Sequence, residues 1–137
     1  MSVLASNRGK SAMEFLNTAF ELEKFTMVSV HRENVIPKRY RLTKGADLIT
    51  SAKTIGNNVV YANSIFPKTK SEYTRRLKFQ QRAVLEIQIM LKDLRLMSEI
   101  LPIKDSVLEE WTRLLLREEE NIKAWMKSDK GRFSNLE

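Results

Sequence analysis

The sequence contains no cysteine, which excludes disulfide bonds, thiol catalysis and cysteine-based zinc sites. Glycine and proline are scarce, with 4 Gly and 3 Pro among 137 residues, so long uninterrupted helices are favoured over many short strands. The apolar runs are far shorter than the roughly 20 residues of a membrane span, and the N-terminal residues lack the apolar region of a signal peptide. A chain of this length and composition predicts one helical domain without membrane contact, which we expect to be cytoplasmic.

Residues suited to catalysis or metal binding are equally few. The sequence has one histidine, His31, and the residue three positions before it is Val28, so the Glu-x-x-His pairs of di-metal helical bundles are absent. No glycine-rich phosphate loop and no nucleophile elbow occurs. Glu118, Glu119 and Glu120 are consecutive, which places them around a helix as a solvated face. We therefore expect no enzymatic activity, no catalytic residue, no metal site and no cofactor.

Capping signals and prolines divide the sequence into four predicted helices. A serine or threonine followed three residues later by glutamate has the spacing of a capping box, and this spacing occurs at Ser11, Thr69 and Ser106. Pro37 suits the first turn of the remaining helix. Helices are thus predicted from Ser11 to about His31, over roughly 37–64, over 69–101, and from Ser106 to about 130.

Four helices joined by short connections predict an all-α, antiparallel up-and-down four-helix bundle. Residues 11–130 would form the bundle. Residues 1–10, which lack helical periodicity, are predicted to form a flexible basic arm, and residues 131–137 a C-terminal tail.

The predicted helix over 69–101 has an apolar face that is too wide for one core. One stripe of apolar residues recurs at intervals of three, four or seven, from Tyr73 to Leu94. Five more apolar residues fall outside this stripe: Leu85, Ile89, Met90, Leu96 and Met97. We expect these five to form a subunit interface, because a second hydrophobic contact surface would account for the width of the face.

The formal net charge of +7 is concentrated at the starts of the second and third predicted helices. The first cluster is Lys38, Arg39, Arg41 and Lys44, and the second is Lys68, Lys70, Arg75, Arg76, Lys78 and Arg82. Intervals of three and four place several of these residues on one ridge, which suits phosphates repeated along a nucleic-acid backbone. A solubilising face is the alternative interpretation. In an up-and-down bundle the two clusters should lie at opposite ends.

Several motifs give this sequence a family resemblance. They are PKRYR at 37–41, ANSIFPKTKSEYTRRLKFQQRA at 62–83, DLRL at 93–96, EEW at 109–111 and IKAWMKSD at 122–129. Their order resembles that of the accessory variability proteins of diversity-generating retroelements. These proteins belong to a wider superfamily of bacterial four-helix bundles that includes proteins encoded in intervening sequences of 23S ribosomal RNA genes. The resemblance covers roughly residues 7–130.

The resemblance implies a homopentameric barrel that binds nucleic acid through a basic surface and associates with a reverse transcriptase. Such a subunit has no polymerase activity; it supports mutagenic cDNA synthesis on a template RNA. The implied nucleic-acid contacts would map onto Lys38, Arg39 and Arg41, and onto Lys68, Lys70, Arg75, Arg76 and Lys78. Two alternatives stay open, a bundle of the ribosomal intervening-sequence type and a protein-interaction scaffold without nucleic-acid binding.

Overall fold

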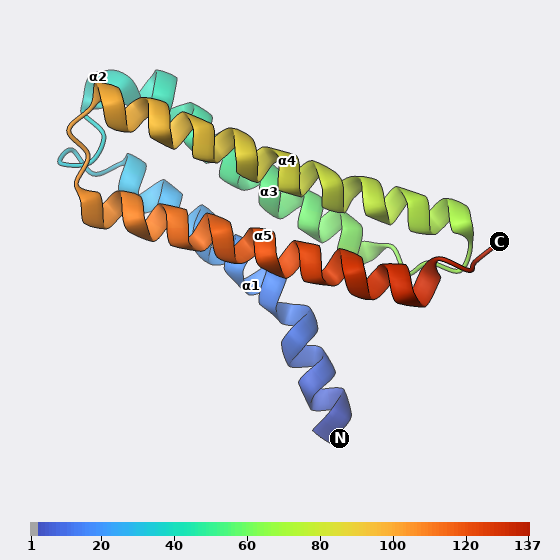
Figure 1. The fold of residues 1–137 in the computed structure, drawn as a ribbon. Helices are drawn as coiled ribbons and strands as arrows, with labels where there is room; N and C mark the ends of the chain where they lie inside the picture. Colours follow the sequence, from blue (N-terminus) through green and yellow to red (C-terminus); the bar gives the residue numbers. More distant parts are fainter. Residues whose placement is uncertain (1–2) are drawn as a thin grey trace.

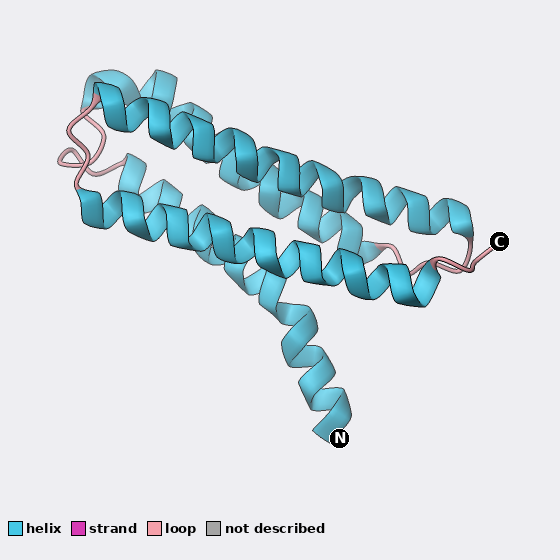
Figure 2. Cartoon of the chain, viewed as in Figure 1, coloured by secondary structure: helices cyan, strands magenta, loops and turns pink. Residues whose placement is uncertain are grey.

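The computed structural model describes the backbone of residues 3–137 and the side chains from residue 14 onward. Its four long helices are α1 (Val3–Val30), α3 (Ala46–Ser64), α4 (Lys70–Ile100) and α5 (Asp105–Phe133). A short helix α2 (Lys38–Tyr40) and a π-helical segment η1 (Arg41–Gly45) lead directly into α3. Residues 3–137 contain no strand (Figure 2). The predicted all-α bundle is therefore confirmed.

The four long helices pack as a square in which neighbours along the chain run in opposite directions (Figure 1). Helix α1 contacts α3 and α5, and α4 contacts the same two helices, so α1 and α4 occupy diagonal corners. The first turns of α1 project away from the other helices (Figure 1). The starts of α2 and α4 consequently lie at opposite ends of the bundle, as expected from the sequence.

Three predicted boundaries can be compared with the observed helix ends. The Thr69 capping box is confirmed, since Thr69 Oγ1 accepts from Glu72 N and Glu72 Oε1 accepts from Thr69 N, both at 3.2 Å. The predicted starts at Ser11 and Ser106 are wrong. Helix α1 is already formed from Val3, eight residues before Ser11. Helix α5 begins at Asp105, since the Lys104 carbonyl already accepts the first helical hydrogen bonds.

The other end of α5 also differs from the prediction. The helix passes the expected stop near residue 130 and ends at Phe133, whose ring is buried. Gly131 has no positive φ and so does not act as a helix terminator. Part of the predicted tail therefore belongs to the bundle.

The π-helical segment η1 brings the chain unusually close to α1. A β-carbon on Gly45 would lie only 2.6 Å from Cγ1 of Val30, which is itself buried. Only glycine fits this contact without displacing its neighbours. The close approach fixes the direction in which α3 enters the bundle.

Buried residues of α4 recur at alternating intervals of three and four: Arg76, Gln80, Ala83, Ile87, Met90, Leu94 and Met97. This stripe faces the bundle core. Met90 and Met97 are therefore core residues, and their assignment to a subunit interface was wrong. Leu85, Ile89 and Leu96, predicted for the same interface, are exposed on α4.

Within residues 3–137, no helix has both the length and the apolar character needed to cross a bilayer. The same part of the chain holds no group of three or more histidine and acidic side chains placed to bind a metal ion.

Candidate nucleic-acid interface

The two predicted basic clusters lie at opposite ends of the bundle. The first end comprises α2 and η1, where Lys38, Arg39 and Lys44 are exposed. Arg41 is partly buried, and its Nη2 donates to Glu33 Oε2 at 2.8 Å. One of the four basic groups at this end is thus already paired within the chain.

The second end comprises the α3–α4 loop and the N-terminal half of α4, where Lys70 N also donates to Glu137 O at 3.1 Å. Its exposed basic side chains are Lys68, Lys70, Arg75, Lys78 and Arg82. Between Asp47 and Glu86 the only acidic residue is Glu72. The hydrogen bond from Lys68 N, with further bonds from Thr69, holds the pKa of Glu72 below its ordinary value. That carboxylate is engaged in capping α4.

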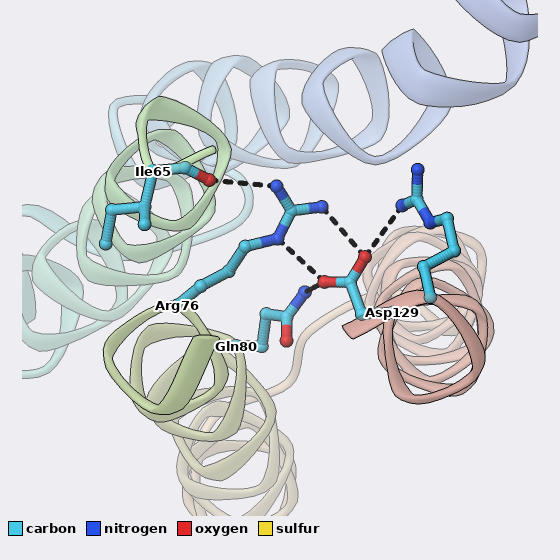
Figure 3. A network of polar contacts seen from close by, with 5 residues as sticks. Ile65, Arg76, Gln80 and Asp129 are labelled. Atoms are coloured by element: carbon cyan, nitrogen blue, oxygen red, sulfur yellow. Dashed lines mark hydrogen bonds and ion pairs between the residues drawn. The ribbon is translucent and has the colours of Figure 1, made fainter. Parts of the chain in front are cut away.

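Arg76, predicted as a nucleic-acid contact, is instead buried with only 6% of its surface exposed. Its Nε and Nη2 donate to the two carboxylate oxygens of Asp129, at 2.7 and 2.9 Å, and Nη1 donates to Ile65 O at 2.9 Å (Figure 3). A guanidinium in this position cannot reach a phosphate on the surface. The assignment of Arg76 to the nucleic-acid surface was wrong.

The Arg76–Asp129 pair is the centre of a larger network that joins α4 to α5. Gln80 Nε2 and Arg132 Nη2 also donate to Asp129, each at 2.8 Å (Figure 3). The Arg76 guanidinium lies 4.9 Å from the ring centroid of Trp125, within the range of a cation–π interaction. The motif IKAWMKSD at 122–129 was recognised in the sequence, but its last residue, Asp129, was assigned no role. No local pattern indicated that Arg76 on α4 is the buried partner of Asp129.

Exposed aromatic side chains accompany the charge at the second end, and sequence reasoning did not single them out. Tyr61, near the end of α3, is 52% exposed, and Phe66, in the α3–α4 loop, is 74% exposed. The Tyr61 ring lies 5.2 Å from that of Phe79 on α4. Arg82 Cζ lies 5.5 Å from the Phe79 ring centroid. A row of contacts therefore connects an exposed tyrosine with an exposed arginine.

Glu118 on α5, predicted as part of a solvated face, is instead fully buried, so that prediction was wrong for this residue. It is a second buried acid, and it has no cationic partner. Asn121 Nδ2 donates to Glu118 Oε1 at 3.4 Å, whereas Oε2 has no hydrogen-bond partner. Burial raises the pKa of Glu118 to about 9, against a smaller lowering by the Asn121 hydrogen bond. The group is therefore a neutral acid at pH 7. It reaches no solvent-accessible site, so we assign it no chemical role.

The fold and the site together define a four-helix bundle with an exposed basic cluster at each end. Comparison of the chain with protein-family models, with curated proteins and with solved structures gave no match.

Proposed function

We propose that this protein is a non-catalytic accessory subunit of a diversity-generating retroelement, acting in the cytoplasm. In this role it binds the reverse transcriptase and its template RNA or cDNA, and it supports mutagenic cDNA synthesis without performing chemistry. The observation that carries the proposal is the α4 basic ridge, formed by Arg75, Lys78 and Arg82. These three side chains are exposed, and the one acid in this stretch of sequence caps a helix.

The spacing of the ridge explains why nucleic acid is the preferred partner. Positions three and four residues apart on a helix lie about 5–6 Å from one another, so the charges form a row. A row of cations suits the regular phosphates of a nucleic-acid backbone, and it provides affinity without sequence preference. The Arg76–Asp129 pair supports the proposal indirectly, because it fixes α4 against α5 beneath the ridge.

We further propose that the subunit assembles into a homopentameric barrel. Support comes from Leu85, Ile89, Leu96 and Ile100, which are exposed and share one stripe of α4. This stripe lies on the helix face opposite the buried stripe, so it is available to a second copy. The number five comes from the family resemblance alone.

The direct test is co-purification of the tagged protein with the reverse transcriptase and template RNA, with and without nuclease, followed by native mass determination. We expect a nuclease-resistant complex that contains several copies of this chain for each polymerase. Recovery of the protein as an oligomer without polymerase or RNA would contradict the retroelement role. It would favour the alternative of a protein-interaction scaffold without nucleic-acid binding.

A separate observation distinguishes the ribosomal intervening-sequence alternative. The retroelement role requires a reverse transcriptase gene and a template/variable repeat pair beside this gene. A gene located within a 23S ribosomal RNA locus would contradict the proposal, even though the fold would be the same.

A further inference from the structure

The aromatic side chains Tyr61 and Phe66 at the second end lie largely outside the bundle core. Tyr61 and Phe66 each present more than half of their surface to solvent, at 52% and 74% exposed. The core at this end is instead formed by Phe133, Trp125 and the Arg76 network. Large exposed rings usually serve recognition when they lie beside other binding groups.

The surroundings of these rings are basic. Phe66 lies two residues before Lys68 in the α3–α4 loop, and Tyr61 contacts Phe79, over which Arg82 is placed. Lys53 on α3 adds another exposed cation on the tyrosine-bearing helix. No carboxylate occurs between Glu72 and Glu86 to compensate the charges of α4. The partner of this surface must therefore combine negative charge with flat, apolar faces.

We propose that Tyr61 and Phe66 are stacking platforms for unpaired bases, so that the second end binds single-stranded nucleic acid in preference to duplex. Nucleic-acid bases stack on aromatic side chains regardless of sequence, while neighbouring cations neutralise the phosphates. Within a duplex both faces of each base are already stacked, and a surface aromatic ring cannot reach them. This inference rests on the proposed nucleic-acid-binding function and specifies the form of the ligand.

Two kinds of side chain contribute to the affinity for nucleic acid in this proposal. Lys78 and Arg82 neutralise the backbone, which makes affinity depend on salt. Tyr61 and Phe66 contact bases, which adds affinity that salt does not screen. The two contributions can therefore be separated by measuring affinity over a range of salt concentrations.

The test is fluorescence anisotropy with a labelled single-stranded oligonucleotide and with the same strand in a blunt duplex, over a salt series. The variants are Tyr61→Ala, Phe66→Ala and Tyr61→Phe. Phe20→Ala is the matched control, because Phe20 is 66% exposed on α1, at the diagonal corner from α4. Circular dichroism and native mass determination check that each variant keeps its fold and assembly.

We expect Tyr61→Ala and Phe66→Ala each to weaken single-strand binding by about tenfold, with an unchanged salt slope. Duplex binding should not change, Tyr61→Phe should keep the wild-type affinity, and Phe20→Ala should have no effect.

Unchanged single-strand affinity in both alanine variants would overturn the stacking inference, and persistent salt dependence would leave the proposed function standing. Equal losses for single strand and duplex would also overturn it. A change in oligomer mass in Tyr61→Ala would identify the ring as a subunit contact and overturn the inference as well. If the wild-type protein binds neither form, the proposed function fails together with the inference.

Discussion

The two ends of the bundle are both basic, but only the second is built around a buried ion pair. At the first end the exposed cations lie on α2 and η1, and Arg41 pairs with the exposed Glu33. At the second end Arg76 and Asp129 are buried, while Arg75, the preceding residue, is exposed. Adjacent arginines can therefore have opposite environments, one buried between two helices and the other exposed to solvent. The charge of a cluster alone does not indicate how many of its members are available for binding.

The largest effect should follow from breaking the buried pair with Asp129→Ala. The variant leaves the Arg76 charge buried without a counterion, which typically costs about 3–5 kcal/mol. The free energy of unfolding, measured by urea denaturation, should fall by that amount. Glu33→Ala is the matched control at the first end, where the exposed pair contributes at most about 1 kcal/mol. Equal losses of unfolding free energy in Asp129→Ala and Glu33→Ala would mean that the buried pair stabilises the fold no more than the exposed pair does.

The next effect concerns binding rather than stability. Replacing Arg75, Lys78 and Arg82 together by glutamine removes three cations and should reduce the slope of log affinity against log salt by about 2–3. The corresponding triple variant at the first end replaces Lys38, Arg39 and Lys44. We expect a smaller reduction there, because Glu33 already lies beside that cluster. A larger loss at the first end would place the principal nucleic-acid contact there. Arg76 is left out of both variants because it is buried and its replacement would lower the stability of the fold as well.

Glu118 extends the comparison to a buried acid without an arginine. Its folded-state pKa is raised to about 9 from an ordinary value of 4.5, so the folded protein holds a proton that the unfolded chain releases. The stabilising effect of this proton is complete below pH 4.5 and is lost as pH rises towards 9. Stability should therefore fall by at most about 1.4 kcal/mol per pH unit across that window. Urea denaturation of Glu118→Gln should show this slope removed; an unchanged slope would contradict the prediction.

The smallest effects come from two helical glycines. Gly45→Ala, at the first end, should lower the free energy of unfolding by about 1–3 kcal/mol, because the new methyl group would overlap Val30. A β-carbon on Gly56, within α3, would meet only Glu23 Oε1, at 3.4 Å. Gly56→Ala should therefore raise the free energy of unfolding by up to about 1 kcal/mol through helix propensity. Thermal unfolding of the two variants should show midpoint shifts of opposite sign. An unchanged or raised midpoint in Gly45→Ala would mean that the close contact at η1 is not restrictive.

Local signals predicted the helices, whereas the direction of individual side chains depended on distant residues. The Thr69 capping box defined the start of α4 correctly, because it acts within a few residues of the chain. The buried stripe of α4 begins with Arg76 and Gln80, two polar residues that concealed its regular spacing. Their inward direction depends on Asp129, which no pattern local to α4 contains.

The same cause explains the errors at the predicted subunit interface. With Arg76 and Gln80 excluded from the core, the buried stripe of α4 could not be followed along its length. Met90 and Met97 then looked like surplus apolar residues, although they continue that stripe in register. Leu85, Ile89 and Leu96, the other residues predicted for that interface, are exposed, and their role as subunit contacts stays a prediction.

The separation of Arg76 and Asp129 along the chain has a consequence for the order of folding. The two residues are 53 positions apart, so the pair forms only after α5 has returned along α4. Arg76 also donates to Ile65 O, only 11 positions away, and this contact between α4 and the end of α3 should form earlier because a shorter loop closes at lower entropic cost. We therefore expect Asp129→Asn to speed unfolding while leaving the folding rate nearly unchanged, which stopped-flow kinetics can measure. The surface proposed to meet nucleic acid lies on the hairpin of α3 and α4, so α5 would be fixed beneath it late in folding.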